Sequence, residues 1–84
     1  MVKPTIHLNG TSASDLNAAY MSAWTAVNDA MFALAKCGPH GRDYYPQGDD
    51  AIVVAAREHR ARMDMLRMVC SDLEELALST QPNR

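Results

Sequence analysis

Apolar residues recur at alternating steps of four and three in two long stretches, and this spacing is what most limits the folds open to the chain. In the second stretch they are Ile52, Ala56, His59, Met63, Leu66, Cys70, Leu73 and Ala77. In the first they are Leu16, Tyr20, Ala23, Val27, Ala30, Leu34 and Cys37. Because residues three and four apart share one side of an α-helix, each set predicts the seam of a packed helical pair.

Capping and breaking residues set the limits of these helices. The hydroxyl of Ser12 can cap free amides at a helix start, while the negative charge of Asp15 interacts favourably with the positive end of the helix dipole. Gly38 can take the left-handed conformation past the last turn, and Pro39 forbids continuation. The acidic pair Asp49-Asp50 favours a second start. We therefore predict an extended arm over 1–11, helices over 12–37 and 49–79, a loop over 38–48 and a tail over 80–84.

Two seams of equal length, joined by a loop of roughly ten residues, predict an all-α antiparallel hairpin in a single domain of 84 residues. The first helix is apolar around most of its circumference. Its charged residues are Asp15, Asp29 and Lys36 alone. A two-helix protein cannot bury such a helix by itself, so we expect an oligomeric helical bundle. In the second helix arginines gather in the first half and acids in the second, which favours antiparallel stacking on a symmetry mate.

Composition excludes several functional classes. The formal charge of −2 argues against general binding of DNA or RNA. No apolar run reaches the ~20 residues that span a bilayer. Cys37 and Cys70 both fall on apolar stripes, so we expect free buried thiols and a reducing bacterial cytoplasm.

Four arginines of the second helix are candidate ligands for an anion. Arg62 has Glu58 four residues before it, and Asp64 stands at pairing distance from Arg60 and Arg67. A solvated face of weak ion pairs is one interpretation. Arg57 has no such partner, so the alternative is that Arg57 and Arg60 point at a phosphate of a ligand.

The loop stretch Arg42-Asp43-Tyr44-Tyr45 is the other candidate. Tyrosines after a helix can simply cover the end of the core. They can also form a stacking platform for a nucleobase, with Arg42 and His40 as anion contacts.

The sequence shows no motif for a catalytic site or a metal site. His59 lies on the seam, where a histidine is more often a hydrogen-bonded core residue than a ligand. No second histidine or carboxylate stands at metal spacing beside it, and no strand-turn-helix elbow frames a serine. We therefore expect no enzyme activity and no cofactor.

The segments His7-Leu8-Asn9-Gly10-Thr11-Ser12 and Gly41-Arg42-Asp43-Tyr44-Tyr45-Pro46-Gln47-Gly48, followed by Glu58-His59 and Arg62, resemble a family of small uncharacterised phage and prophage proteins. The similarity covers nearly the whole chain and implies a phage setting. More distantly, the overall plan is similar to the small helical phage proteins of the anti-CBASS sponge type, which sequester cyclic oligonucleotide signals between subunits. That resemblance is one of architecture and transfers no binding residue.

The leading hypothesis is a non-enzymatic oligomer that captures a small anionic ligand, most plausibly a nucleotide immune signal. The expected contact residues are Arg42, Tyr44, Tyr45, Arg57 and Arg60, joined by His7, Asn9 and Thr11 if a neighbouring subunit's arm reaches them. The condition is needed because a helix of ~25 residues is ~37 Å long and separates arm from loop. The alternative is a protein-interaction module that grips a host or phage protein through Met21, Trp24, Met31 and Phe32.

Overall fold

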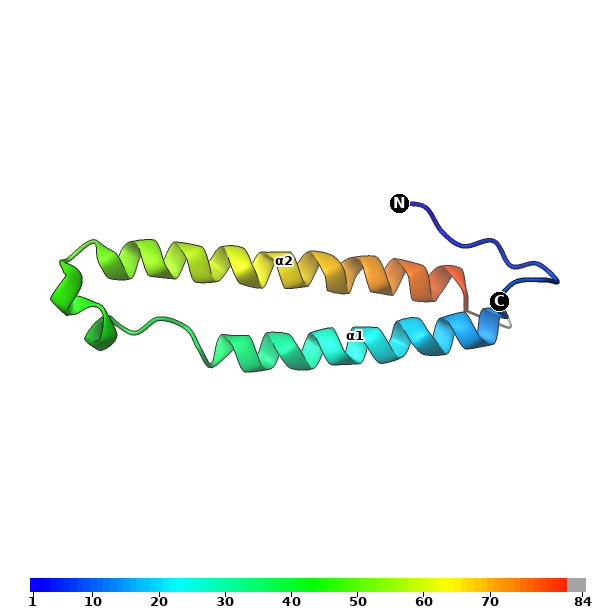
Figure 1. The fold of residues 1–84 in the computed structure, drawn as a ribbon, viewed down its shortest axis with the longest axis horizontal. Coiled ribbons are helices and arrows are strands. Elements are labelled where there is room, and N and C mark those ends of the chain that lie inside the picture. Colours follow the sequence, from blue (N-terminus) through cyan, green and yellow to red (C-terminus); the bar gives the residue numbers. More distant parts are fainter. Residues whose placement is uncertain (82–84) are drawn as a thin grey trace.

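The computed structural model of the chain describes residues 1–81, which form an antiparallel helical hairpin (Figure 1). Helix α1 spans Ala13–Ala35 and helix α2 spans Ala51–Ser79. Two short 3-10 turns, η1 over Gly41–Asp43 and η2 over Tyr45–Gln47, lie between them. The described residues contain no strand, which confirms the all-α prediction. The molecule measures 61 × 20 × 20 Å. Of the predicted tail 80–84, residues 82–84 lie outside the described residues.

The backbone groups at the two ends of α1 find hydrogen-bond partners in different ways. At its start the Ser12 hydroxyl accepts a hydrogen bond from the Asp15 amide at 3.1 Å, as the capping pattern predicts. At its end the amides of residues 36–38 donate to carbonyls three residues back, which tightens the last turn. The expectation of a left-handed Gly38 is wrong, because this tightened turn needs no positive φ. Within the described residues, Gly48 is the glycine with positive φ, at 108°.

The seam of α2 is confirmed along its whole length. All eight predicted positions are at least partly buried, and Cys70 and Ala77 are fully buried. The match holds because residues at alternating steps of four and three form one continuous stripe along α2, and this stripe packs against α1.

The seam of α1 is only partly as predicted. Ala30 and Cys37 are exposed, while Met31 and Trp24, expected beside the seam, are half-buried. Large side chains have more apolar surface to bury than alanine, and they turn the helix toward their own row. Cys37 is exposed because α1 ends two residues before it, so the expectation of two buried thiols is wrong for this one.

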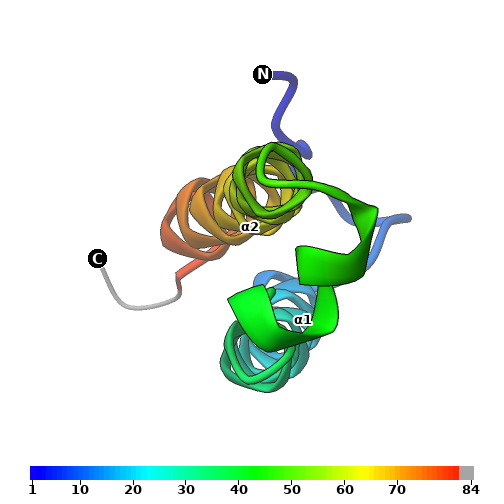
Figure 2. The same ribbon diagram turned by 90° about the vertical axis from the view of Figure 1, so that its left-hand side faces the viewer.

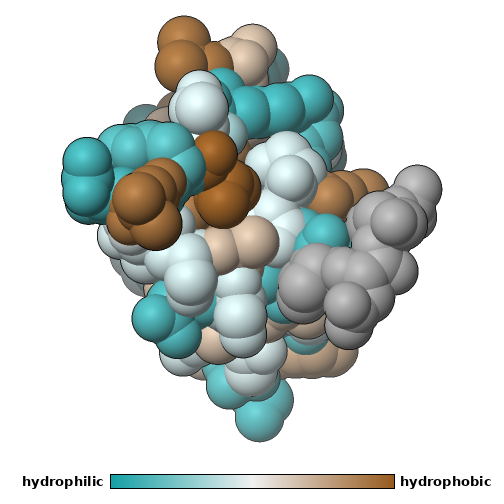
Figure 3. Space-filling view, turned by 90° about the vertical axis from the view of Figure 1, so that its right-hand side faces the viewer, coloured by the Kyte–Doolittle hydropathy of each residue, from teal (hydrophilic) through white to brown (hydrophobic). Residues whose placement is uncertain are grey.

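A single hairpin buries very little. The buried residues of the described chain are Ala55, Cys70, Ala77 and Thr80, none of them large. Phe32 is 67% exposed and Met68 is 69% exposed. Viewed toward the end that carries the arm and the last turn of α2, hydrophobic surface reaches solvent in several separate patches (Figure 3). A chain of this size stabilises itself poorly with so small a core, which keeps the oligomer expectation open.

Candidate functional site

The loop end of the hairpin carries five of the eight expected site residues. Arg42 lies in η1, Tyr44 and Tyr45 follow it, and Arg57 and Arg60 lie in the first turns of α2. Viewed from this end, the two short turns lie in front of the hairpin (Figure 2). The fold therefore brings basic and aromatic side chains of three elements, η1, η2 and α2, to one end of one chain.

Local hydrogen bonds and one glycine shape this loop. The Arg42 amide donates to Nδ1 of His40 at 3.2 Å, so that ring nitrogen serves the turn. The amides of Asp43 and Tyr44 donate to the carbonyls of His40 and Gly41, both at 3.0 Å. Gly48, with φ 108° and ψ 166°, closes η2 in a conformation open essentially to glycine. These hydrogen bonds and the Gly48 conformation define the backbone of the loop, and therefore the positions from which its side chains extend.

The two tyrosines have different surroundings. Tyr44 is half-buried. Tyr45 is 75% exposed, with its ring open to solvent. Of the two interpretations for this pair, covering the core suits Tyr44, whereas a stacking platform suits Tyr45.

Arg57 and Arg60 line the same surface hollow, three residues apart on α2. Its volume is about 350 Å³, and its other lining residues are Ile52, Val53 and Ala56. The only ion pair within residues 1–81 joins Arg67 and Asp64 at 2.7 Å. The expected partner of Arg60 is therefore engaged elsewhere, and Arg62 and Glu58 do not meet either. Two unpaired guanidinium groups beside apolar surface can bind an anion that carries a flat or apolar part.

The arm residues His7, Asn9 and Thr11 lie at the opposite end (Figure 1). The Gly10 amide donates to the His7 carbonyl at 3.1 Å, which makes a turn. Beyond the turn the chain folds back, and Lys3 shares a surface hollow with Glu75, Leu78 and Ser79 in the last turns of α2. Within one chain the arm does not reach the loop.

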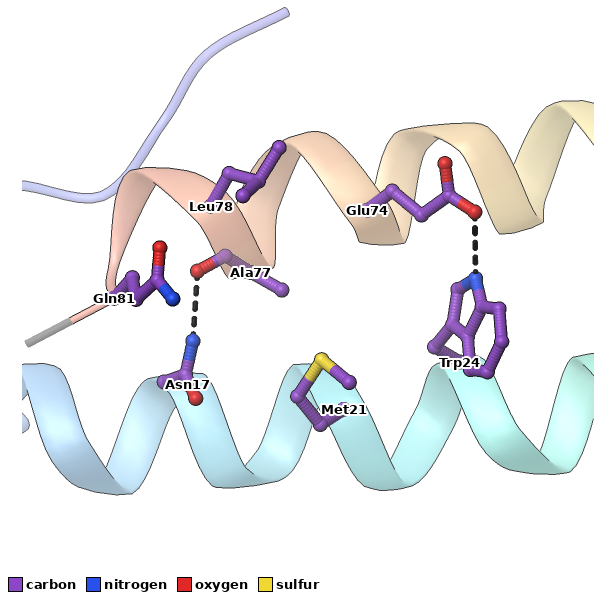
Figure 4. A pocket seen from close by; sticks show the side chains of 7 residues that line it. All are labelled: Asn17, Met21, Trp24, Glu74, Ala77, Leu78 and Gln81. Atoms are coloured by element: carbon purple, nitrogen blue, oxygen red, sulfur yellow. Dashed lines mark hydrogen bonds between the residues drawn. The ribbon is translucent and has the colours of Figure 1, made fainter.

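A second feature escaped the sequence analysis: a groove along one face between the helices. Its largest hollow, about 430 Å³, is lined by Met21, Trp24 and Asn17 of α1 together with Glu74, Ala77 and Leu78 of α2, and by Gln81 (Figure 4). The Asn17 amide donates to the Ala77 carbonyl at 2.7 Å, and the Trp24 indole donates to Glu74 at 2.9 Å. Asn17 stands seven residues before Trp24, and that heptad relation was the available signal.

The groove continues toward the loop. A second hollow shares Trp24 and Glu74 with the first, and a third shares Asn28 and Met31 with the second. Phe32 lines the third hollow from its open side. This face is mostly apolar, and it is the surface that the protein-partner alternative would use.

Residues 1–81 contain no group of three or more His, Cys, Asp or Glu side chains placed to hold a metal ion. His59 is half-buried against the end of α1, where its ring faces Gly38. No helix within the described range has the length and apolarity to cross a membrane. Comparisons with protein-family models, with curated proteins and with solved structures each returned no match.

Proposed function

We propose that this chain is a non-enzymatic, self-associating helical hairpin that binds a small anionic ligand of nucleotide type at its loop end. The observation that carries the proposal is the hollow with Arg57 and Arg60, since neither guanidinium has a carboxylate partner in the described chain. Each hydrogen bond from such a group to a phosphate contributes about 1.5–3 kcal/mol.

The aromatic component comes from the neighbouring loop. Residues of η2 contact α2, so Tyr45 is held near the start of the helix that carries the arginines. A base stacked on an exposed ring contributes about 1–3 kcal/mol. Phosphate and base together describe a nucleotide.

Sequestration is the role that fits this chemistry. The hollow offers charge, the neighbouring loop offers the ring of Tyr45, and the residues that line the hollow include no cluster of acids and bases that could cleave a ligand, so capture and retention are the proposed outcome. In the phage setting that the motif resemblance implies, the ligand is a host nucleotide immune signal, and the protein is an anti-defence sponge.

The proposal is tested by native mass spectrometry of the protein with a mixed pool of cyclic di- and trinucleotides. We expect a stoichiometric adduct whose mass identifies the ligand. Arg57→Ala with Arg60→Ala removes two charge-assisted contacts, so affinity falls by at least tenfold per arginine. Arg67→Ala is the matched control, because Asp64 already holds that guanidinium. Retention of the adduct by the double variant contradicts the site.

Tyr45 is tested separately. Tyr45→Phe keeps the stacking ring and binding, whereas Tyr45→Ala weakens binding by about tenfold or more. Equal binding by both variants removes stacking from the proposal.

The protein-interaction alternative rests on Phe32, which is 67% exposed at the apolar groove. Large aromatic anchors of this kind are typical of protein interfaces. Hydroxyl-radical footprinting of the purified protein separates the two functions. Protection of Phe32 shows that self-assembly covers it and contradicts the alternative, whereas full reactivity shows that the groove stays accessible to a partner protein.

A further inference from the structure

The face of the hairpin opposite the groove carries a row of alanines in α1, with Ser22 and Asp29 between them, and charged residues toward its two ends. In α1 it holds Ala19, Ala26 and Ala33, seven residues apart and all exposed. Ala26 is two residues from Trp24, and so about 200° around the helix from the groove. In α2 this face holds Met65 and Val69, which are 59% and 46% exposed. We call it the back face.

Four charged residues mark the ends of the back face. Asp15 precedes Ala19 by four residues, and Lys36 follows Ala33 by three. On α2, Arg62 precedes Met65 by three residues, and Asp72 follows Val69 by three. Because the helices are antiparallel, both acids lie near the arm and both bases lie near the loop.

No intrachain ion pair within residues 1–81 uses any of these four charges. Asp29, three residues after Ala26, and Glu58, four residues before Arg62, also lie toward the loop end of this face, so the loop half is close to neutral while the arm half carries Asp15 and Asp72 without a base. A face with separated charges of this kind is complementary to itself once it is turned end over end.

We infer that a second copy of this chain docks on the back face, antiparallel to the first and related by a two-fold axis that passes close to Ala26. In that arrangement Asp15 of each copy faces Lys36 of the other. These residues stand eleven positions before and ten after Ala26. A parallel arrangement would instead oppose acid to acid and base to base.

The charges of α2 place the two-fold axis at the same level as those of α1. Arg62 and Asp72 lie five residues on either side of Arg67. Within the hairpin, Asn17 bonds to Ala77 and Met31 shares a hollow with Met63. Ala26 is therefore level with the stretch around residue 68. A single two-fold axis at that level therefore pairs the charges of both helices, and it places Arg62 of one copy opposite Asp72 of the other.

The area of the back face suits a stable dimer. The 23 residues of α1 are about 35 Å long, because each residue adds about 1.5 Å. With the 20 Å width of the molecule this gives a face of roughly 700 Å², near the ~800 Å² per partner of a standard interface. Alanine lets two helix backbones approach closely, while Met65 and Val69 supply apolar area at the flank.

The arrangement also brings the arm of one copy to the loop of the other, and the role of this contact in binding rests on the proposed function. Pairing centred on Ala26 puts Ala13 of one copy level with Pro39 of the other. The arm residues Asn9 and Thr11 then lie at the other copy's loop, beside the segment that leads to Arg42. Each two-fold dimer would hold two such contacts between arm and loop, while the Arg57–Arg60 hollow stays open on the groove side of α2, where Arg60 stands seven residues before Arg67.

The dimer is tested without any ligand, by light scattering after gel filtration. We expect the unmodified chain to have at least twice the mass of one chain. Ala26→Glu brings two carboxylates together at the axis and lowers the mass toward one chain, or weakens association by at least tenfold. Ala35→Glu is the control and leaves the mass unchanged, because Ala35 is also exposed but stands nine residues after Ala26 and so lies on the opposite, groove side of α1. Equal masses for the two variants overturn the inference.

Orientation is tested by disulfide cross-linking in a Cys37→Ser background, which removes the exposed native thiol. Chains with Ala19→Cys are mixed with chains with Ala33→Cys. Antiparallel docking gives cross-links in the mixture and none in either variant alone. Cross-links of Ala19→Cys with itself, or none in the mixture, overturn the inference. Because both tests omit nucleotide, the dimer can fail while nucleotide binding survives, and the reverse.

Discussion

The two ends of the hairpin are built differently. Near the arm, two side-chain hydrogen bonds join the helices, from Asn17 to Ala77 and from Trp24 to Glu74, and Ala77 and Thr80 are buried. Toward the loop, Ala55 is buried, but the described residues have no such bond between α1 and α2, and the exposed side chains include Phe32, Tyr45 and Arg57. The difference indicates that the hydrogen bonds between the two helices stabilise the arm end, while the loop end carries the residues of the proposed site.

The largest effect is expected from overpacking the arm end. Ala77→Leu adds three carbons where alanine is 5% exposed, so the free energy of unfolding falls by about 1–3 kcal/mol. Ala35→Leu, an exposed alanine near the loop, changes it by less than about 0.5 kcal/mol. Urea unfolding followed by circular dichroism measures both. Equal losses would mean that the two ends are packed alike.

At the loop end, the backbone conformation of Gly48 is one that favours glycine, so a substitution there tests how firmly the loop is held. Gly48→Ala places a Cβ at φ 108°, which costs about 1–3 kcal/mol although no atom lies within 4 Å. Gly41→Ala meets equally open space without positive φ and is expected to be neutral. Thermal unfolding of the two variants gives the difference, and a stable Gly48→Ala would show that the loop conformation is not held.

A smaller loss is expected from the hydrogen bond at the arm end. Asn17→Ala leaves the Ala77 carbonyl without this donor, so stability falls by about 0.5–1.5 kcal/mol. Asn28→Ala is the comparison, since Asn28 is also half-buried on the groove side but makes no side-chain hydrogen bond within the described chain. Chemical denaturation of both tells whether the bond or the packing matters, and a larger loss for Asn28→Ala would reverse the assignment.

The smallest effect is expected between the two ends, at the exposed ion pair. Asp64 and Arg67 are 62% and 56% exposed, so Asp64→Asn costs about 0.5 kcal/mol or less. The same variant frees the Arg67 guanidinium. If added salt changes the stability of the unmodified chain and the variant by the same amount, the pair contributes nothing.

Much of the fold followed from the sequence, because a regular heptad pattern and a Ser12 cap are local signals with direct structural meaning. The α2 seam was right at every position for this reason. Errors arose where side-chain size competed with the pattern, as when Met31 displaced Ala30. They also arose where α1 ended early and left Cys37 in solvent.

The site was harder to predict. A hairpin places Tyr45 of the loop and the nearby Arg57 and Arg60 of α2 at the same end, so their clustering could be predicted. The groove could not, because it depends on contacts between residues 50 to 60 apart in the sequence, such as Trp24 with Glu74. A pattern within one helix carries no information on which flank faces a neighbour. That choice is made by packing.

The chain has a single tryptophan, and its indole spans the two helices at the arm end. Its fluorescence therefore reports on one place only. A change in emission signals separation of α1 from α2 near Glu74, and binding at the loop should leave the emission unaltered unless it is transmitted along the helices. The molecule thus contains an intrinsic optical probe for distinguishing local binding from opening of the whole hairpin.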